Sequence, residues 1–395
     1  MPKRSMLISY FVFMGLILVW GMPVQAKQGA PPLNAPFVDP TATVTGADKV
    51  HLGDSVYVAP FAELRAGADP ALTIHIGAES DVQDSAVVDA TAGAVSMGEQ
   101  VILAHGATVK GPASLGGEGI CPGSVAVCPS FVSFNAEVDG AIIEKDAMVS
   151  GLARVAPGVR IPSGRKVLPG KNVATQAEVL TETVPVSDAD RLFMQGVIEV
   201  NVAFAAQYKV LAAEDPKNIK GINYDPGNMS FNPARNLPTL AGTSTQNPKF
   251  RNRIIGDIIM HDNMNHLAMV MGSKISLRAD EGEPFHVGSI AAMEDRTTFH
   301  ALEHSHLDMG NLGRYGYHSV VHGGPTNFPV PAGNSTVTGD GVTIGAWSVF
   351  FRSRAADGVT IGFKSLVQQS DLAPGTIVPD RTVMIDNTIF GAVEW

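Results

Sequence analysis

The sequence is poor in charged residues and has no basic stripe. Charged side chains make up 17% of the 395 residues, and the formal net charge at pH 7 is −10. No run of Lys and Arg with interleaved aromatic residues occurs, which argues against a nucleic acid as a partner.

Cysteine is scarce as well, since only Cys121 and Cys128 occur, in the segment ICPGSVAVCP. A disulfide that closes this short loop and a pair of free buried thiols are both compatible with the sequence. No histidine lies near either cysteine in sequence, so neither is a good candidate for a metal ligand.

Only one long apolar run is present, and it lies at the N-terminus. Lys3 and Arg4 precede an apolar stretch at residues 6–20, and VQA at 24–26 fits a small-residue cleavage site. We therefore expect residues 1–26 to be a signal peptide, with an uncleaved N-terminal anchor as the alternative. Either way, the bulk of the chain is expected to be exported to the periplasm or the cell exterior.

Glycine and proline are frequent, with 41 and 26 residues, and hydrophobic residues make up 45% of the chain. This combination favours a fold rich in turns and strands. A six-residue rhythm begins in VHLGDSVYVAPFAELRAG (50–67) and continues in IHIGAESDVQDSAVVDA (74–90). In each hexad an aliphatic residue precedes glycine or another small turn residue. This pattern is typical of a parallel β-helix with three hexads to a coil.

The rhythm is interrupted once and then restarts. Residues 186–214 carry apolar side chains at helical spacing and predict one long amphipathic helix. Residues 215–247 are rich in Asn, Pro, Gly and Thr and predict a linker. In 248–395 the segment FHVGSIAAMEDRTTFHA follows the layout of IHIGAESDVQDSAVVDA. The sequence therefore predicts an all-β fold with two β-helix domains in tandem, 27–185 and 248–395.

Five of the eleven histidines lie close together in the second half, with an arginine and acidic residues upstream. Neutral imidazole is a common ligand of zinc-like metals, and a catalytic site needs three protein ligands and an open position for water. Carboxylates near such a site can carry protons. The stretch 274–325 therefore holds either a metal site or a histidine-rich surface loop. The histidines are His300, His304, His306, His318 and His322.

The motifs of both halves resemble those of the gamma-class carbonic anhydrases, whose fold is a left-handed parallel β-helix. The family signature is an Arg-x-Asp-Glu run, a Gln-Asp strand that ends in His-Ala, and His-x4-His-Gly-Pro. In this chain RADE (278–281), HA (300–301) and VHG (321–323) follow that signature. The resemblance implies a trimer in which three histidines hold a metal ion between neighbouring subunits.

The second half looks like the working copy of the family's site. The resemblance implies that His300, His318 and His322 hold Zn²⁺, with Fe²⁺ or Co²⁺ as alternatives. An ungapped match places Tyr317 at the middle ligand position, and a one-residue bulge is needed to bring His318 there.

Five residues near these histidines are the candidate catalytic residues. By resemblance, Arg278 and Asp280 pair across the subunit boundary, and Glu281 together with Glu303 relays the proton. Glu294 stands where the family has the glutamine that orients the metal-bound solvent. An acid at that position would alter the pKa of the solvent.

The first half looks like a decayed copy. It keeps His105, but Asp89 and Lys110 stand at the positions of the other two family histidines. A lysine must lose its proton to bind zinc, so we expect this half to serve assembly. Asn201, in the predicted helix, matches a family asparagine that lines the site.

The resemblance implies reversible hydration of carbon dioxide to bicarbonate, because a bound metal lowers the pKa of water from about 15.7 to about 7. Two alternatives stay open: an inactive subunit with a role in assembly, and a hexapeptide-repeat acyltransferase. The expected export argues against the acyltransferase, since acyl-CoA is cytosolic. We expect a homotrimer with no membrane contact beyond the possible N-terminal anchor.

Overall fold

The computed structural model describes residues 34–214, 239–240, 252–256, 258–280, 285–302, 305–324 and 335–395. All of them belong to one compact unit, Pro31–Trp395. The predicted signal peptide lies outside the described residues, as does the predicted linker apart from Thr239–Leu240. Among the described helices, none has the length and apolar character to span a membrane.

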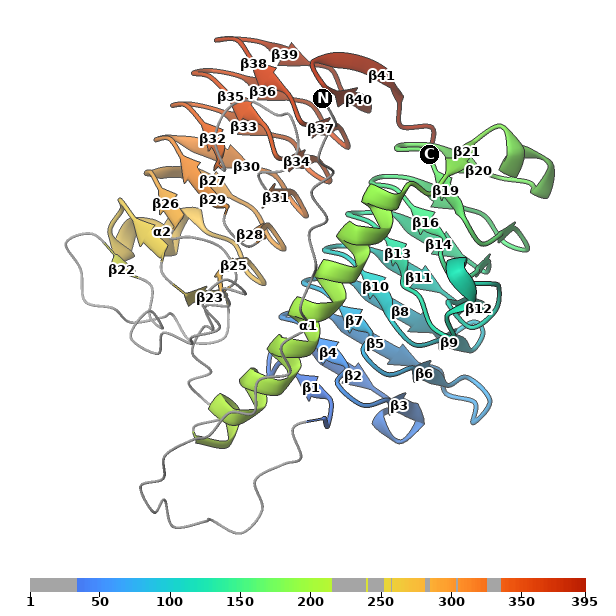
Figure 1. The fold of residues 1–395 in the computed structure, drawn as a ribbon. Coiled ribbons are helices and arrows are strands. Elements are labelled where there is room, and N and C mark those ends of the chain that lie inside the picture. The colour runs from blue at the N-terminus through green and yellow to red at the C-terminus, as the bar shows by residue number, and fades with distance from the viewer. Residues whose placement is uncertain are drawn as a thin grey trace, which may run out of the picture. The chain divides into compact units, whose positions relative to one another are not determined.

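The first half is a β-helix built from three sheets whose strands recur in every coil (Figure 1). All pairings are parallel except the last one, between β19 and β21. Sheet A contains β1 (Phe37–Val38), β4 (Tyr57–Val58), β7 (Asp81–Val82), β10 (Val101–Leu103), β13 (Ser130–Val132), β16 (Met148–Val149), β19 (Arg165–Val167) and β21 (Thr183–Pro185). Sheet B contains β2 (Thr43–Thr45), β5 (Glu63–Ala66), β8 (Val87–Ala90), β11 (Thr108–Lys110), β14 (Glu137–Asp139), β17 (Arg154–Val155) and β20 (Asn172–Val173). Sheet C contains β3 (Val50–Leu52), β6 (Ile74–Ile76), β9 (Val95–Met97), β12 (Ala113–Leu115), β15 (Ile142–Ile143) and β18 (Arg160–Ile161).

The second half repeats this three-sheet plan and thereby confirms the predicted tandem β-helices. Here the last pairing, between β40 and β41, is antiparallel. Sheet D contains β22 (Thr239–Leu240), β24 (Ile258–Met260), β26 (Phe285–Val287), β29 (His306–Met309), β32 (Ser335–Thr338), β35 (Arg354–Ala355) and β38 (Asp371–Leu372). Sheet E contains β23 (Arg253–Gly256), β25 (Ser276–Ala279), β28 (Thr298–Ala301), β31 (Val320–Gly323), β34 (Val349–Phe351), β37 (Leu366–Gln368), β40 (Thr382–Ile385) and β41 (Thr388–Ala392). Sheet F contains β27 (Ile290–Met293), β30 (Gly313–Tyr315), β33 (Thr343–Ile344), β36 (Thr360–Ile361) and β39 (Ile377–Val378).

The aliphatic residue of each hexad fills the inside of the coils. Side chains alternate between the two faces of a strand, so one aliphatic residue per strand points inward and stacks on its equivalent in the next coil. Six consecutive members of one such stack in sheet A are fully buried. They are Val58, Val82, Leu103, Val132, Val149 and Val167.

Helix α1 (Asp188–Glu214) begins at a capping box. The Ser187 hydroxyl accepts a hydrogen bond from the Asp190 amide at 3.1 Å, and the Asp190 carboxylate accepts one from the Ser187 amide at 2.9 Å. Met194 and Ile198 pack on sheets A and E, and Tyr208 packs further along against β1 and β4. The helix therefore lies where the two β-helices meet.

Sheets A and E bury apolar side chains against one another and against α1. Phe134 and Leu152 from the first half lie in one cluster with Val349 and Leu366 from the second. Burial of a side chain of this size contributes about 1.5–3 kcal/mol, so the contact between the halves is a core of its own. A buried ion pair between Arg253 and Asp39, 3.0 Å apart, adds a polar link.

Shorter helices complete the fold. Helix α2 (Met264–Val270) is capped by Asn263, whose side chain accepts from the His266 amide. The 3₁₀ turns are η1 (Ala47–Lys49), η2 (Pro122–Ser124) and η3 (Gln176–Leu180). Next to η2, Cys121 and Cys128 form a disulfide, which decides the alternative that the sequence left open.

Candidate metal centre

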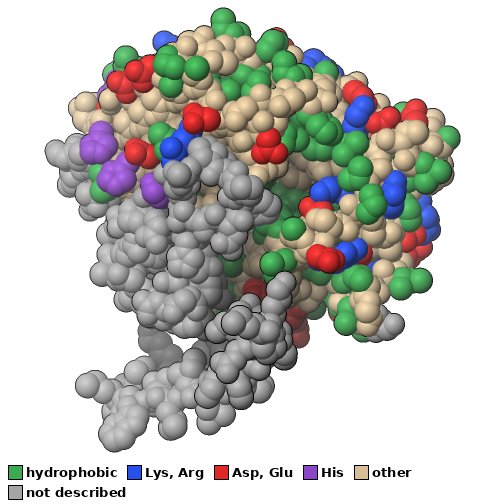
Figure 2. Space-filling view, turned by 45° about the horizontal axis from the view of Figure 1, so that its top comes forward, with side chains coloured by type: hydrophobic (Ala, Val, Ile, Leu, Met, Phe, Trp, Pro, Cys, Tyr) green, Lys and Arg blue, Asp and Glu red, His purple; other side chains and the backbone are tan. Residues whose placement is uncertain are grey.

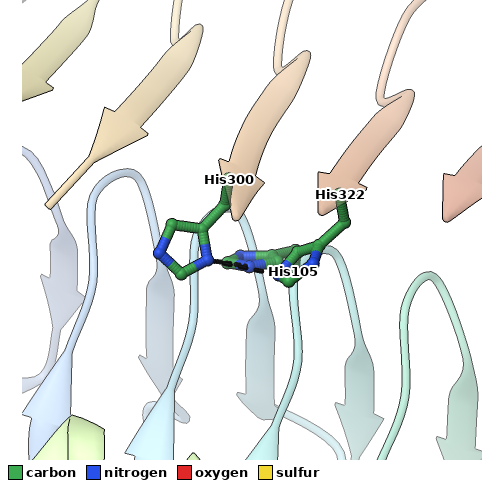
Figure 3. Close-up of side chains that lie close together, drawn as sticks. All are labelled: His105, His300 and His322. Atoms are coloured by element: carbon green, nitrogen blue, oxygen red, sulfur yellow. Dashed lines mark hydrogen bonds between the residues drawn. The ribbon is translucent and has the colours of Figure 1, made fainter. Parts of the chain in front are cut away.

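Three buried histidines from both halves of the chain converge on one point (Figure 3). His105 follows β10 of the first half, whereas His300 and His322 belong to β28 and β31 of the second half. The Nδ1 atom of His300 lies 3.3 Å from Nε2 of His105 and 3.2 Å from Nε2 of His322. One ring nitrogen of each residue therefore faces a common centre.

Strand register brings the two histidines of the second half together. β28 and β31 are parallel neighbours in which His300 and His322 are direct partners. Their neighbours Phe299 and Val321 point into the β-helix core, so the alternation along each strand turns both imidazoles outward, toward the first half.

His105 reaches the same point from the turn that ends β10. Gly106, the next residue, has φ of 72°, and a Cβ atom there would lie 1.9 Å from the Asn135 side chain and 2.8 Å from His318. Only glycine fits this close approach of the two halves. The glycine thus lets the loop that carries His105 press against the second β-helix.

The second ring nitrogen of each histidine is held by an acceptor group. Nδ1 of His105 lies 3.0 Å from the Asp84 carboxylate, and Nε2 of His300 lies 3.3 Å from the Asp280 carboxylate. Nδ1 of His322 contacts the backbone carbonyl of Gly323. Such outer partners fix the tautomer and the ring orientation of metal-ligating histidines.

Two of the nitrogen–nitrogen distances in the cluster fit a tetrahedral metal. With metal–nitrogen bonds of about 2.0–2.1 Å, two ligands at a tetrahedral angle lie about 3.3–3.4 Å apart. The two nitrogen–nitrogen distances of 3.3 and 3.2 Å match this value. Three imidazoles leave one position open, as catalytic zinc sites require.

Burial keeps the three imidazoles neutral, which is the form that binds metals. Loss of solvation lowers the pKa of His105 and brings that of His300 down to about 4. It holds the pKa of His322 well below its usual range. All three side chains can therefore bind a metal at neutral pH without first releasing a proton.

Arg278 ties the outer partners of the two halves together. Its guanidinium donates to Asp84 of the first half at 2.8 and 3.0 Å and also pairs with Asp280, which follows the end of β25. The Tyr208 hydroxyl of α1 donates to Asp280 at 2.5 Å. Arg278, Asp84 and Asp280 are almost completely buried, so this network is shielded from solvent.

A small recess lies beside His300 and His322. Its volume is about 20 Å³, which is enough for one water-sized molecule. Two amide side chains, those of Gln83 in the first half and Asn201 in helix α1, line it together with Phe134. Asn201 donates to the Val197 carbonyl at 2.8 Å, which fixes the orientation of its amide.

The structure corrects the expected ligand set, because His105 and not His318 joins His300 and His322. His318 has φ of 60° and stacks on Trp347 with ring centroids 4.2 Å apart. Its Nδ1 atom lies 3.1 Å from the Asn135 side chain. The left-handed backbone at this turn directs the imidazole into the contact between the halves, away from the cluster.

The other candidate residues differ in where they lie relative to the three histidines. Arg278 and Asp280 lie beside the three histidines. Arg278 pairs with Asp84 across the contact between the two halves of one chain, whereas the expected pairing was across a subunit boundary. Glu294 is exposed and accepts from the Tyr317 amide at 2.7 Å, whereas Gln83 lines the recess. Glu281 and Glu303 lie outside the described residues, so their predicted relay stays a prediction.

The sequence did contain a signal for the missed ligand. The first half keeps His105, Gln83 and Asp84 but lacks the outer two family histidines, whereas the second half keeps those two and has Tyr317 at the middle position. Each half thus retains what the other lacks. Two copies that complement one another in this way indicate a single shared site.

The sequence of the chain is similar to those of known proteins. The chain is 29% identical over 211 residues to a carbonic anhydrase of Methanosarcina thermophila, a match that covers 47% of this chain and 78% of that protein. It is 31% identical over 206 residues to the carboxysome assembly protein CcmM of a Nostoc species, covering 48% of this chain. The chain spans only 33% of the length of that second protein.

Among solved structures, a hexapeptide transferase family protein of Anaplasma phagocytophilum shares 21% identity at a TM-score of 0.32, covering 44% of this chain and 92% of its own. No family model matches the chain. Over about half of its length the chain is therefore similar to a carbonic anhydrase and to a carboxysome assembly protein.

Tyr208→Phe is expected to weaken metal binding roughly tenfold, at the lower end of the effect of outer partners, because Asp280 loses a hydrogen bond while it holds His300. Competition with a chromophoric chelator measures the affinity, and the visible spectrum of bound Co²⁺ reports a changed ligand orientation. Tyr57→Phe is the matched control, since Tyr57 is equally buried beside Arg278. An unchanged affinity and spectrum in Tyr208→Phe would contradict this role.

Proposed function

We propose that this chain is a metal-dependent carbonic anhydrase that interconverts carbon dioxide and bicarbonate. The observation that carries the proposal is the set of three buried imidazoles, His105, His300 and His322, each with its second nitrogen held by an acceptor group. When bound, a zinc-like ion lowers the pKa of water to about 7 and so supplies a nucleophile at neutral pH.

The side chains around the recess suit this substrate. Phe131, Phe134 and Phe193 give it an apolar wall, which suits an uncharged molecule such as carbon dioxide. The amides of Gln83 and Asn201 supply the polar groups that orient the reactants by hydrogen bonding. Asp84 and Asp280 hold two of the ligand imidazoles in place during the reaction.

The test is hydration of carbon dioxide by the full chain after reconstitution with Zn²⁺, Co²⁺ or Fe²⁺. We expect activity in at least one metal form and its loss in His322→Ala, measured by stopped-flow with a pH indicator. The matched control is His306→Ala, because His306 lies on the neighbouring sheet D outside the cluster. Full metal occupancy without hydration in any of the three forms would refute the proposal.

Similarity to CcmM favours a second candidate, a structural role in which the β-helices serve assembly. Under that proposal the metal would hold the two halves together without catalysis. The two candidates differ in one measurement, because only the enzyme loses a measurable rate in His322→Ala. We also keep export and a homotrimer as proposals. Since all three histidines belong to one chain, metal binding itself needs no second subunit.

Acid should destabilise the metal-free protein between about pH 6.5 and pH 4. The folded pKa of His300 is about 4 and the unfolded value is about 6.5, so only the unfolded state gains a proton in this window. The stability present above pH 6.5 is therefore lost as the pH falls, on the order of 3 kcal/mol for this group.

Urea unfolding of chelator-treated protein at several pH values measures this loss. His51→Gln with His75→Gln is the control, since both imidazoles are exposed on sheet C and their replacement should leave the profile unchanged. A midpoint that does not move between pH 7 and pH 4.5 would show that the buried imidazoles are not kept neutral.

A further inference from the structure

A cavity of about 440 Å³ lies between the two β-helices and the beginning of α1. Its walls combine Phe131 and Met148 of sheet A, Phe193 of α1, and Phe351 and Leu366 of sheet E. Protein cavities that bind small molecules measure about 300–1,000 Å³ and are lined in the same way by apolar and aromatic side chains. The size and the walls of this cavity are therefore those of a binding site.

The cavity reaches the molecular surface. Ser187, which precedes α1, and Phe390 of β41 both belong to its lining, and both are exposed. A small molecule can therefore enter the cavity from the solvent while both β-helices stay folded.

The cavity also adjoins the metal centre. Phe131, Phe134 and Phe193 line both the cavity and the small recess that contains His300 and His322. Phe134 lies against the ligand ring of His322, with centroids 4.9 Å apart. One layer of aromatic side chains therefore separates the cavity from the recess.

Charged side chains in the described lining are engaged with other groups of the protein. Lys166 and Asp190 form an ion pair at 2.7 Å. The guanidinium of Arg352 lies over the rings of Phe351 and Phe193, at 4.4 and 5.5 Å from their centroids. An ion that entered this space would lose its hydration shell against a mainly aromatic wall. The cavity therefore favours an uncharged molecule.

We propose that this cavity is an antechamber for carbon dioxide, from which the molecule passes the aromatic layer to reach the three histidines. Carbon dioxide is the uncharged carbon species of the proposed reaction, so this assignment rests on the proposed function. Bicarbonate is charged and water is strongly hydrogen-bonded in solution, so an apolar space concentrates carbon dioxide relative to both.

Gly151 allows the cavity to be filled by a single substitution. It is a buried residue of the lining, and a Cβ atom there would lie 3.8 Å from the Leu366 side chain, which is an ordinary contact. We therefore expect Gly151→Leu to fold and to occupy part of the space. Gly196→Leu is the matched control, because Gly196 is exposed on α1 outside the lining and no described atom lies within 4 Å of a Cβ atom there.

Crystals of the full chain under xenon pressure test whether the cavity takes up an uncharged molecule. Xenon binds in apolar protein cavities of about 150 Å³, and its anomalous scattering locates it. We expect a peak beside Phe131, Phe193 and Leu366 in the wild type, with or without metal, and in Gly196→Leu. The peak should be lost in Gly151→Leu. A wild-type cavity without xenon would overturn the proposal, whether or not the variants fold.

The kinetics of carbon dioxide hydration test the route to the metal. In the active metal form, Gly151→Leu should lower kcat/KM about fivefold or more, mainly through a higher KM, because less carbon dioxide is held beside the recess. Metal content and the visible spectrum of bound Co²⁺ should stay unchanged, which distinguishes a blocked route from a distorted metal centre. A folded Gly151→Leu that has lost the xenon peak but keeps the kcat/KM of Gly196→Leu would refute the route.

The outcomes separate this proposal from the proposed function. Xenon in the cavity of a chain that hydrates no carbon dioxide in any metal form would refute the enzyme and the route, but leave the site for uncharged molecules standing. Hydration that does not respond to Gly151→Leu would leave the enzyme standing and refute the antechamber.

Discussion

Replacing His105 by alanine is expected to remove the metal as completely as replacing His300 or His322. His105 supplies one of three converging nitrogens, and no other described residue of its own half belongs to the cluster. Structural zinc sites of four ligands bind with about 10–16 kcal/mol, so losing one ligand should weaken binding by on the order of 100-fold or more. Metal analysis after dialysis, together with the hydration rate, measures the effect.

His318→Ala is the decisive control for this prediction. His318 is as buried as the ligands and lies in the same contact between the halves, but its ring faces Asn135 and Trp347. We expect this variant to keep its metal. Metal retained in His105→Ala but lost in His318→Ala would mean that the second half holds the ion by itself.

The second large effect is expected on stability. Arg278→Ala should lower the free energy of unfolding by about 3–5 kcal/mol, because it strands the buried carboxylates of Asp84 and Asp280. Asp84 belongs to the first half and Asp280 to the second, so the contact between the β-helices should be weakened as well. Urea unfolding of metal-free protein isolates this effect from that of the metal.

Arg65→Ala is the matched control, because Arg65 occupies the equivalent position in the first half. It pairs with Glu63 and Asp89, but 41% of its side chain is exposed. Ion pairs of this kind contribute about 0–1 kcal/mol. Equal losses in Arg65→Ala and Arg278→Ala would show that burial of the Arg278 network adds nothing to stability.

The fold could be predicted from the sequence because the hexad pattern is local and is repeated along the chain. Each hexad places one aliphatic residue inward, and the stack of Val58, Val82 and Leu103 shows the outcome. The interruption of the hexad rhythm by helix α1 could be predicted as well, since its apolar residues recur at helical spacing. In the structure they pack on both halves. Repetition makes each weak local signal reinforce the others.

Only part of the metal centre could be predicted from the sequence, because one of its histidines is brought in by contacts between residues that are far apart in the chain. His300 and His322 lie 22 positions apart on neighbouring strands, so the repeat alone predicts that they meet. His105 lies 195 positions from His300, and their meeting depends on how two β-helices pack. Hexad rhythm determines the coils but carries no information on that packing. The resemblance implied His318 as the middle ligand through a one-residue bulge, whereas the left-handed turn at this residue sends its ring elsewhere.

Surface features help little in finding this centre. On the face shown in Figure 2, acidic and basic side chains are scattered and histidines gather at one edge. The three ligands are instead at most 4% exposed and lie between the halves. Surface histidines therefore do not mark the site, which is marked by the convergence of three buried ones.

The most direct test of a single metal site shared by the two halves is anomalous diffraction at the zinc edge from crystals of the zinc-loaded full chain. The structure predicts one peak per chain, bounded by Nε2 of His105, Nδ1 of His300 and Nε2 of His322 from the same chain. A peak beside His318, or one whose histidines come from different chains, would contradict it.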